Sequence, residues 1–120
     1  MTKQQKIKLF KESVRKWQEY FGLCDWEIFT DDMDEDDARA RASWNYNGRI
    51  ATIYYDNEWI NRKNMSKKEI DRVAFHECAE IYFYFIHHPI KDQRGKDYAE
   101  ECVHKVIRLL ENKILGIEPE

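Results

Sequence analysis

The chain has 120 residues, of which 42% are hydrophobic, 14% aromatic and 36% charged, with a formal net charge of −3. This length suits one domain over 1–120, and the hydrophobic content excludes a disordered chain. The negative net charge gives no overall attraction to nucleic acid, so we do not expect a nucleic-acid partner. No apolar stretch is long enough to span a bilayer, and the first residues are polar, unlike a secretory signal, so we predict no membrane partner. The three cysteines form no disulfide framework, and we therefore predict a cytoplasmic protein.

The first half of the chain is predicted to form one helix and three strands. Apolar residues spaced three and four apart indicate an amphipathic helix over 2–21, and aromatic and β-branched residues indicate a strand over 26–30. Six acidic residues in seven positions make 31–37 a solvated loop. Alternating patterns over 39–46 and 49–55 flank Asn47-Gly48, a pair that favours a type I′ turn, so we expect a β-hairpin.

Two helices are predicted to follow the hairpin. After a polar connection over 56–64, Ser66 and Glu69 form a capping box, which predicts a helix from Ser66 to about Ile86, before Pro89. A last helix is expected over 97–115, closed by Gly116. Its expected apolar stripe is Tyr98, Cys102, Val106, Leu109 and Leu110. The predicted fold class is therefore α+β, with an N-terminal helix, a three-stranded antiparallel sheet containing a hairpin, and two C-terminal helices.

The first of these two helices carries the pattern HExxE. His76 and Glu80 lie four residues apart, so their side chains project from one face of the helix. In the HExxH zinc helix, the residues at i and i+4 hold the metal and the glutamate at i+1 polarises its water. We therefore predict His76 and Glu80 as metal ligands and Glu77 as the catalytic general base of a metal-assisted hydrolysis. Candidate oxyanion donors are Tyr55, Tyr82 and Tyr98.

A zinc site of this kind needs a third protein ligand, and the last predicted helix offers Glu100, Glu101 and His104. We prefer His104, because it completes a set of two histidines and one glutamate, which zinc sites use. Either glutamate would add negative charge, weaken zinc as a Lewis acid and make manganese or iron more suitable. The HExxE pattern also arises by chance in helices rich in these residues, and the partners of Glu80 would then be Lys67, Arg72 or Lys105.

The chain also resembles a known family. An N-terminal helix, a strand opening with Trp26-x-Ile28, an alanine-rich strand, its hairpin partner and a helix carrying Ala74-Phe75-His76-Glu77 resemble the minimal zinc-metallopeptidase-like domains of bacteriophage and prophage genomes. Those domains are related in fold to the SprT-like peptidases. The last helix, with Glu100-Glu101-Cys102-Val103-His104, is similar to their C-terminal helix. The resemblance implies a single zincin-like domain, a zinc site that includes His76, and Glu77 as general base, with Glu80 in place of the family's second histidine.

Two functions follow from these patterns. The first is a zinc-dependent metallohydrolase, peptidase-like, acting on a protein or peptide. The second is a catalytically inactive protein of the same fold, a phage accessory or inhibitor protein that binds a host macromolecule through its acidic loop and aromatic surface. Metal content and the effect of replacing Glu77 distinguish the two.

Overall fold

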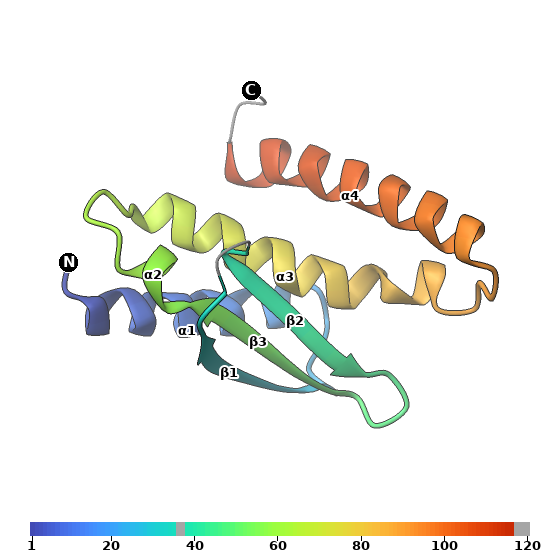
Figure 1. Ribbon diagram of the computed structural model, residues 1–120, viewed down its shortest axis with the longest axis horizontal. Coiled ribbons are helices and arrows are strands. Elements are labelled where there is room, and N and C mark those ends of the chain that lie inside the picture. Colours follow the sequence, from blue (N-terminus) through green and yellow to red (C-terminus); the bar gives the residue numbers. More distant parts are fainter. Residues whose placement is uncertain (36–37, 117–120) are drawn as a thin grey trace.

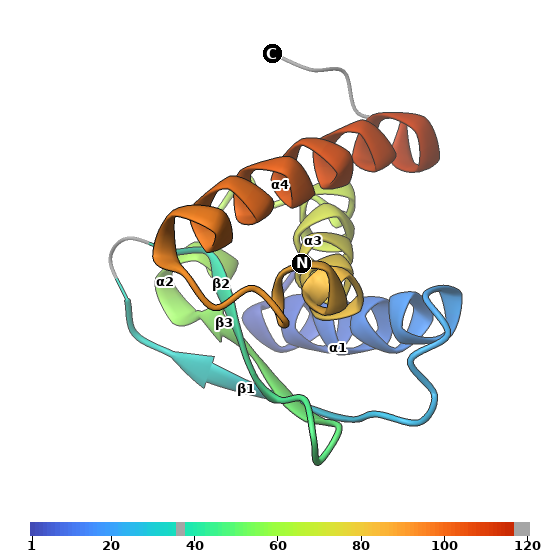
Figure 2. The ribbon, with the colours of Figure 1, turned by 90° about the vertical axis from the view of Figure 1, so that its right-hand side faces the viewer.

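A computed structural model describes residues 1–35 and 38–116, with the side chains of 85–87 also outside the described set. Its elements in chain order are α1 (Lys3–Tyr20), β1 (Glu27–Met33), β2 (Ala40–Asn45), β3 (Ile50–Asp56), α2 (Asn57–Ile60), α3 (Lys67–His87) and α4 (Gln93–Leu115). Helix α3 is central, because it packs against α1, α4 and strand β2 (Figures 1 and 2). No helix of the described residues is long and apolar enough to cross a membrane.

The three strands form a mixed sheet in the order β1-β3-β2, so the predicted antiparallel sheet is wrong. Strands β2 and β3 pair antiparallel, as the hairpin requires, whereas β1 pairs parallel with β3. Strand β3 is central because it is the most buried, with Ala51, Ile53 and Tyr55 facing the helices. Strand β2 begins at the end of the sheet where β1 finishes, on the other side of β3 and therefore two strand spacings, about 10 Å, from β1. Since β2 runs back from there and β3 reverses again, β3 is parallel to β1.

Strand β1 also continues further into the acidic segment than predicted. Asp31 and Asp32 pair with Tyr54 and Tyr55 of β3, while their own side chains remain exposed. The side-chain amide of Asn57 donates to Asp32 at 3.0 Å. Backbone pairing therefore extends the strand where the charged side chains can stay in water. The remainder of the predicted loop includes 36–37, which lie outside the described residues.

The hairpin is confirmed, but its turn is not type I′. The pairing of Asn45 with Ile50 leaves a four-residue loop, in which the Arg49 amide donates to the Tyr46 carbonyl at 3.3 Å. A type I′ turn needs positive φ at both central residues, yet Arg49 is the only non-glycine residue with positive φ among those described (φ 52°), and Gly48 is not among the positive-φ glycines. The longer loop moves the left-handed position to the residue just before β3.

The helices differ from the prediction mainly in where α4 begins and in which face of α4 is buried. The amide of Gly95 donates to the side chain of Asp92, so α4 begins at Gln93 rather than near 97. Its buried face is Ala99, Val103, Ile107 and Glu111. The predicted stripe is therefore wrong in part, since Tyr98, Val106 and Leu109 are exposed. The predicted connection over 56–64 contains the short helix α2, whose Trp59 and Ile60 are buried in the core.

Candidate metal centre

Helices α3 and α4 bring together three predicted ligands. Oε1 of Glu80 lies 3.2 Å from Nε2 of His76 and 3.0 Å from Nε2 of His104. One donor atom from each of the three side chains lies within 4.8 Å of the others. Tetrahedral zinc with ligand distances near 2.0–2.2 Å needs donors roughly 3.3–3.5 Å apart. The three donors therefore fit a metal ion with small side-chain adjustments.

The other partners considered at the sequence level do not join this group. Glu101 is exposed, and its Oε1 lies 4.0 Å from Nζ of Lys105. Glu100 is exposed and lines a pocket together with Glu80 and His104, but its carboxylate is not one of the three grouped donors. Arg72 pairs with two other glutamates rather than with Glu80. Among the candidates for the third ligand, the geometry favours His104, because only that side chain reaches Glu80.

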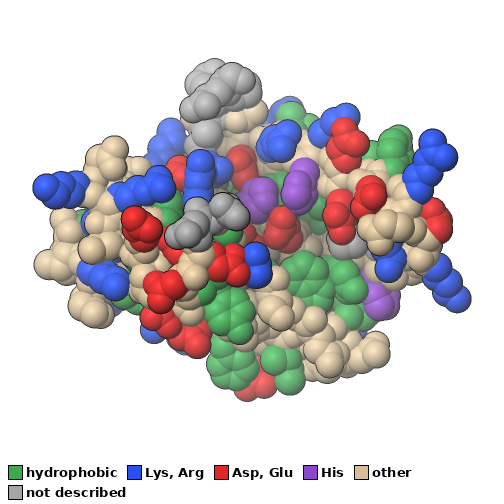
Figure 3. Space-filling model, in the orientation of Figure 1, with side chains coloured by type: hydrophobic (Ala, Val, Ile, Leu, Met, Phe, Trp, Pro, Cys, Tyr) green, Lys and Arg blue, Asp and Glu red, His purple; other side chains and the backbone are tan. Residues whose placement is uncertain are grey.

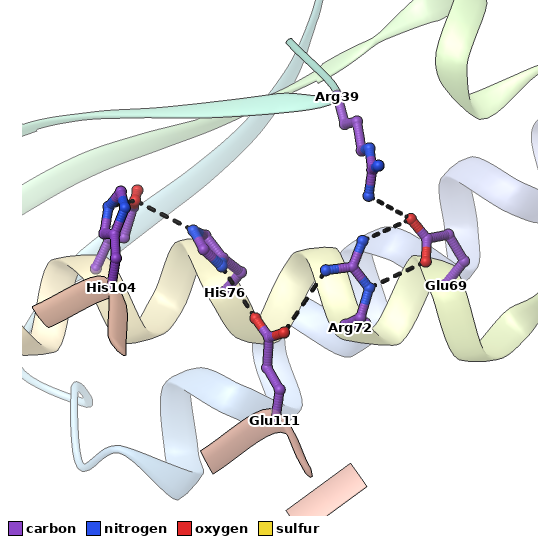
Figure 4. A network of polar contacts seen from close by, with 7 residues as sticks. Arg39, Glu69, Arg72, His76, His104 and Glu111 are labelled. Atoms are coloured by element: carbon purple, nitrogen blue, oxygen red, sulfur yellow. Dashed lines mark hydrogen bonds and ion pairs between the residues drawn. The ribbon is translucent and has the colours of Figure 1, made fainter. Parts of the chain in front are cut away.

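The buried carboxylate of Glu111 contacts Nδ1 of His76, the ring nitrogen that does not face Glu80. Nδ1 of His76 lies 3.0 Å from Oε1 of Glu111, whose other oxygen lies 3.6 Å from the Arg72 guanidinium. Arg72 makes two hydrogen bonds to Glu69, at 3.0 and 2.7 Å, and Arg39 donates to the same carboxylate (Figure 4). A carboxylate on Nδ1 orients the ring and leaves Nε2 for a metal, as is usual for metal-binding histidines.

Sequence reasoning missed Glu111, although a signal was present. Glu111 lies seven residues after His104, which is two helical turns, so both side chains project from the same face of α4. In such an arrangement the histidine can bind a metal together with the histidine of the facing antiparallel helix. The acidic residue two turns away can then orient that facing histidine through its other ring nitrogen.

Without a metal, His76 is the cation of the group. Burial opposes the charge on its ring, but hydrogen bonds to Glu111 and Glu80, and the charges of Glu80 and Glu77, outweigh burial and raise its pKa from 6.5 to about 10. Burial also opposes the charge of Glu80, but the hydrogen bond and charge of His76, with further contributions from Glu77 and His104, outweigh burial and lower the pKa of Glu80. A metal ion must therefore displace a proton from Nε2 of His76.

Glu77 is the buried carboxyl beside these donors. Only 6% of the residue is exposed, and its Oε2 has no hydrogen-bond partner in the described part of the chain. Burial, with the charge of Glu80 next, raises the pKa of Glu77. A buried acceptor without a partner is uncommon in folded proteins and asks for an explanation, such as a catalytic role.

A pocket of about 260 Å³ adjoins the donors. It is lined by Trp44, Glu80, Glu100, Val103 and His104. The space-filling view shows two histidine side chains together with acidic groups on this open face (Figure 3). Trp44 comes from edge strand β2 and was not predicted as a site residue, because alternation places it on the inward face of its strand.

The three tyrosines proposed as oxyanion donors do not line this pocket. Tyr55 packs edge-on against Phe10 at 5.7 Å, Tyr82 stacks on Phe21 at 5.3 Å, and Tyr98 is 71% exposed.

The comparisons with protein-family models, curated proteins and solved structures find no match to the chain.

Proposed function

We propose that the protein is a metal-dependent hydrolase of amide bonds, with His76, Glu80 and His104 as metal ligands and Glu77 as general base. One observation carries the proposal: three ligand atoms from two helices converge beside a buried carboxyl that has an unpartnered oxygen. Three protein ligands leave a fourth position open, as catalytic zinc sites do, and the adjoining pocket gives access to it.

The donor set supports zinc as the ion. Two imidazoles and one carboxylate are an established set of ligands for catalytic zinc. The carboxylate of Glu111, which contacts Nδ1 of His76, increases the basicity of that ligand. When bound, zinc polarises a substrate carbonyl and lowers the pKa of a coordinated water. Manganese and iron remain the alternatives, because the carboxylate ligand also suits harder ions.

Glu77 supplies the proton transfer. As a carboxylate it accepts a proton from the attacking water, and as a carboxylic acid it returns that proton to the leaving amine. Burial and the Glu80 charge bring its pKa closer to neutral pH, which favours both roles. A bound cation beside it would favour the ionised form that the first step requires.

A peptide is the proposed substrate because of the strand beside the pocket. Strand β2 is an edge of the sheet, and its Trp44 lines the pocket that reaches the donors. An unpaired strand edge can pair with the backbone of an extended peptide, which would carry an amide bond across the pocket. The resemblance to phage metallopeptidase-like domains points to the same class of substrate.

Metal content tests the ligand set. The wild-type protein and the variants His76→Ala, His104→Ala and His88→Ala are dialysed against zinc, freed of excess metal, and analysed by elemental mass spectrometry. His88 is an exposed histidine that stacks on Tyr46, so its variant is the matched control. We expect about one zinc per chain in wild type and control, and loss in the other two.

Replacing the general base then separates binding from catalysis. Glu77→Gln should retain zinc and lose hydrolysis of a mixed peptide library, since the amide cannot accept the proton. Equal zinc in all four proteins of the first experiment would refute the ligand set. Zinc without hydrolysis in the wild type would leave the inactive binding protein as the better description.

A further inference from the structure

A second surface feature lies at the opposite edge of the sheet from the metal centre. A groove of about 570 Å³ runs between α1 and the edge strand β1. Its strand wall is formed by Ile28, Phe29 and Thr30, and its helix wall carries Lys8, Lys11 and Arg15. None of these residues belongs to the proposed metal centre.

The strand wall presents backbone groups available for pairing. The amide of Glu27 donates to the Arg49 carbonyl at 2.8 Å, so the backbone groups of Glu27, and of every second residue after it, point toward β3. By the same alternation, the N–H and C=O groups of Ile28 and Thr30 point away from the sheet, and they have no partner among the described residues. An exposed edge of this kind is a template for another strand.

The helix wall is cationic and unpaired. Lys8, Lys11 and Arg15 are exposed, and no ion pair within the described part of the chain engages any of them. Glu12 is the only acidic side chain among the described residues that line the groove. Three cations against one anion make this groove complementary to acidic side chains, although the chain as a whole is negative.

We propose that an acidic, extended segment of a partner protein binds in this groove as a fourth strand, pairing with Ile28 and Thr30 of β1 and placing carboxylates beside the α1 cations. Backbone pairing supplies affinity in such complexes, and the charged wall supplies selectivity. Phe29, 51% exposed, offers an apolar contact for one side chain of the added strand.

Charge also disfavours a second copy as occupant. An antiparallel pairing of two β1 edges centred on Phe29 would place Glu27 directly opposite Asp31 of the other copy, because they lie two residues either side of the centre. Like charges directly opposite each other destabilise a strand pair. A partner strand of different sequence carries no such penalty.

The test uses amide chemical shifts of the ¹⁵N-labelled full chain. The probe is a capped nine-residue peptide of alternating glutamate and valine. We expect saturable shifts centred on the amides of Ile28 and Thr30. The double variant Lys8→Glu/Lys11→Glu should bind about tenfold more weakly or worse. The control Lys63→Glu/Lys67→Glu makes the same charge change at exposed lysines outside the groove, and should leave binding unchanged.

Two modified peptides test strand pairing without altering the protein. Methylation of alternate backbone nitrogens removes the donors from one edge of the peptide only. One methylation pattern should abolish the shifts and the complementary pattern should preserve them. Absence of shifts at β1 up to millimolar peptide, or equal binding of both methylated peptides, would overturn the proposal. So would β1 shifts produced by a thymidine oligonucleotide in place of the peptide, or by raising the protein concentration alone.

Discussion

Nδ1 of His76 and Oε1 of Glu111 lie 3.0 Å apart, although the two residues are separated by 35 positions in the chain. This contact joins α3 to α4 and directs Nε2 of His76 toward Glu80. The relationship explains how two helices without a metal already hold the donors in position. It also makes Glu111 the residue through which the ligand geometry can be tested without replacing a ligand.

Glu111→Gln is expected to weaken zinc binding by about 10- to 100-fold, because the amide cannot supply the charge that orients and polarises the imidazole. Competition titration with a zinc-binding chromophore measures the loss. Glu101→Gln, an exposed residue on the same helix, is the control and should change the affinity by less than about twofold. Unchanged affinity in Glu111→Gln would mean that this carboxylate does not serve the ligand.

The stability of the metal-free protein should fall as pH rises from about 6.5 to 10. The folded protein keeps a proton on His76 up to a pKa of about 10, whereas the unfolded chain loses it near 6.5. Since the folded state binds the extra proton, this window carries a slope of up to about 1.4 kcal/mol per pH unit. Urea unfolding between pH 6.5 and 9 measures it, and His76→Gln should flatten the slope. An identical slope in the variant would contradict the assignment.

Zinc affinity should show the opposite trend over the same range. Binding releases the proton that His76 retains, so apparent affinity rises by about tenfold per pH unit for each proton released. Calorimetry in buffers of different ionisation enthalpy counts the protons directly. A release of no proton at pH 7 would show that His76 is not displaced from its hydrogen bond to Glu80.

Glu77→Gln should stabilise the metal-free protein increasingly as pH rises above the ordinary range of glutamate. Burial and the charge of Glu80 raise the pKa of Glu77, so ionisation costs the folded state and not the unfolded one. The neutral amide avoids that cost, and we expect a gain of about 1–3 kcal/mol at pH 9 and little change at pH 5. Paired urea titrations at the two pH values test this, and an equal effect at both would be inconsistent with a buried, neutralised carboxyl.

The core contribution of α2 can be measured at Ile60. This side chain is fully buried, so Ile60→Ala should lower the free energy of unfolding by about 2–5 kcal/mol through lost burial and a residual cavity. Ile50→Ala is the matched control, because Ile50 is 44% exposed at the start of β3. Its cost should stay below about 1 kcal/mol. Similar losses at the two positions would argue that α2 does not pack as described.

Local patterns in the sequence determined the elements that depend on near neighbours. Helix α1 begins and ends within one residue of the prediction, and Ser66 caps α3 through the Glu69 amide. The hairpin of β2 and β3 follows from the alternating patterns on either side of Asn47-Gly48. The i and i+4 spacing placed His76 and Glu80 on one face, because a helix repeats about every 3.6 residues.

Features that depend on distant partners were decided by the tertiary structure. Sequence alternation does not say which strand is central, so β1 was expected in an antiparallel sheet and instead lies parallel to β3. It likewise does not say which face of α4 meets α3. Ligand chemistry favoured His104 over Glu100 and Glu101, but only the packing brings His104 to Glu80 and Glu111 to Nδ1 of His76. The sequence by itself determined which residues share a helix face or strand, since covalent spacing sets those positions. The packing of helices and strands decided which faces meet, because burial of the whole core outweighs the preference of any one segment.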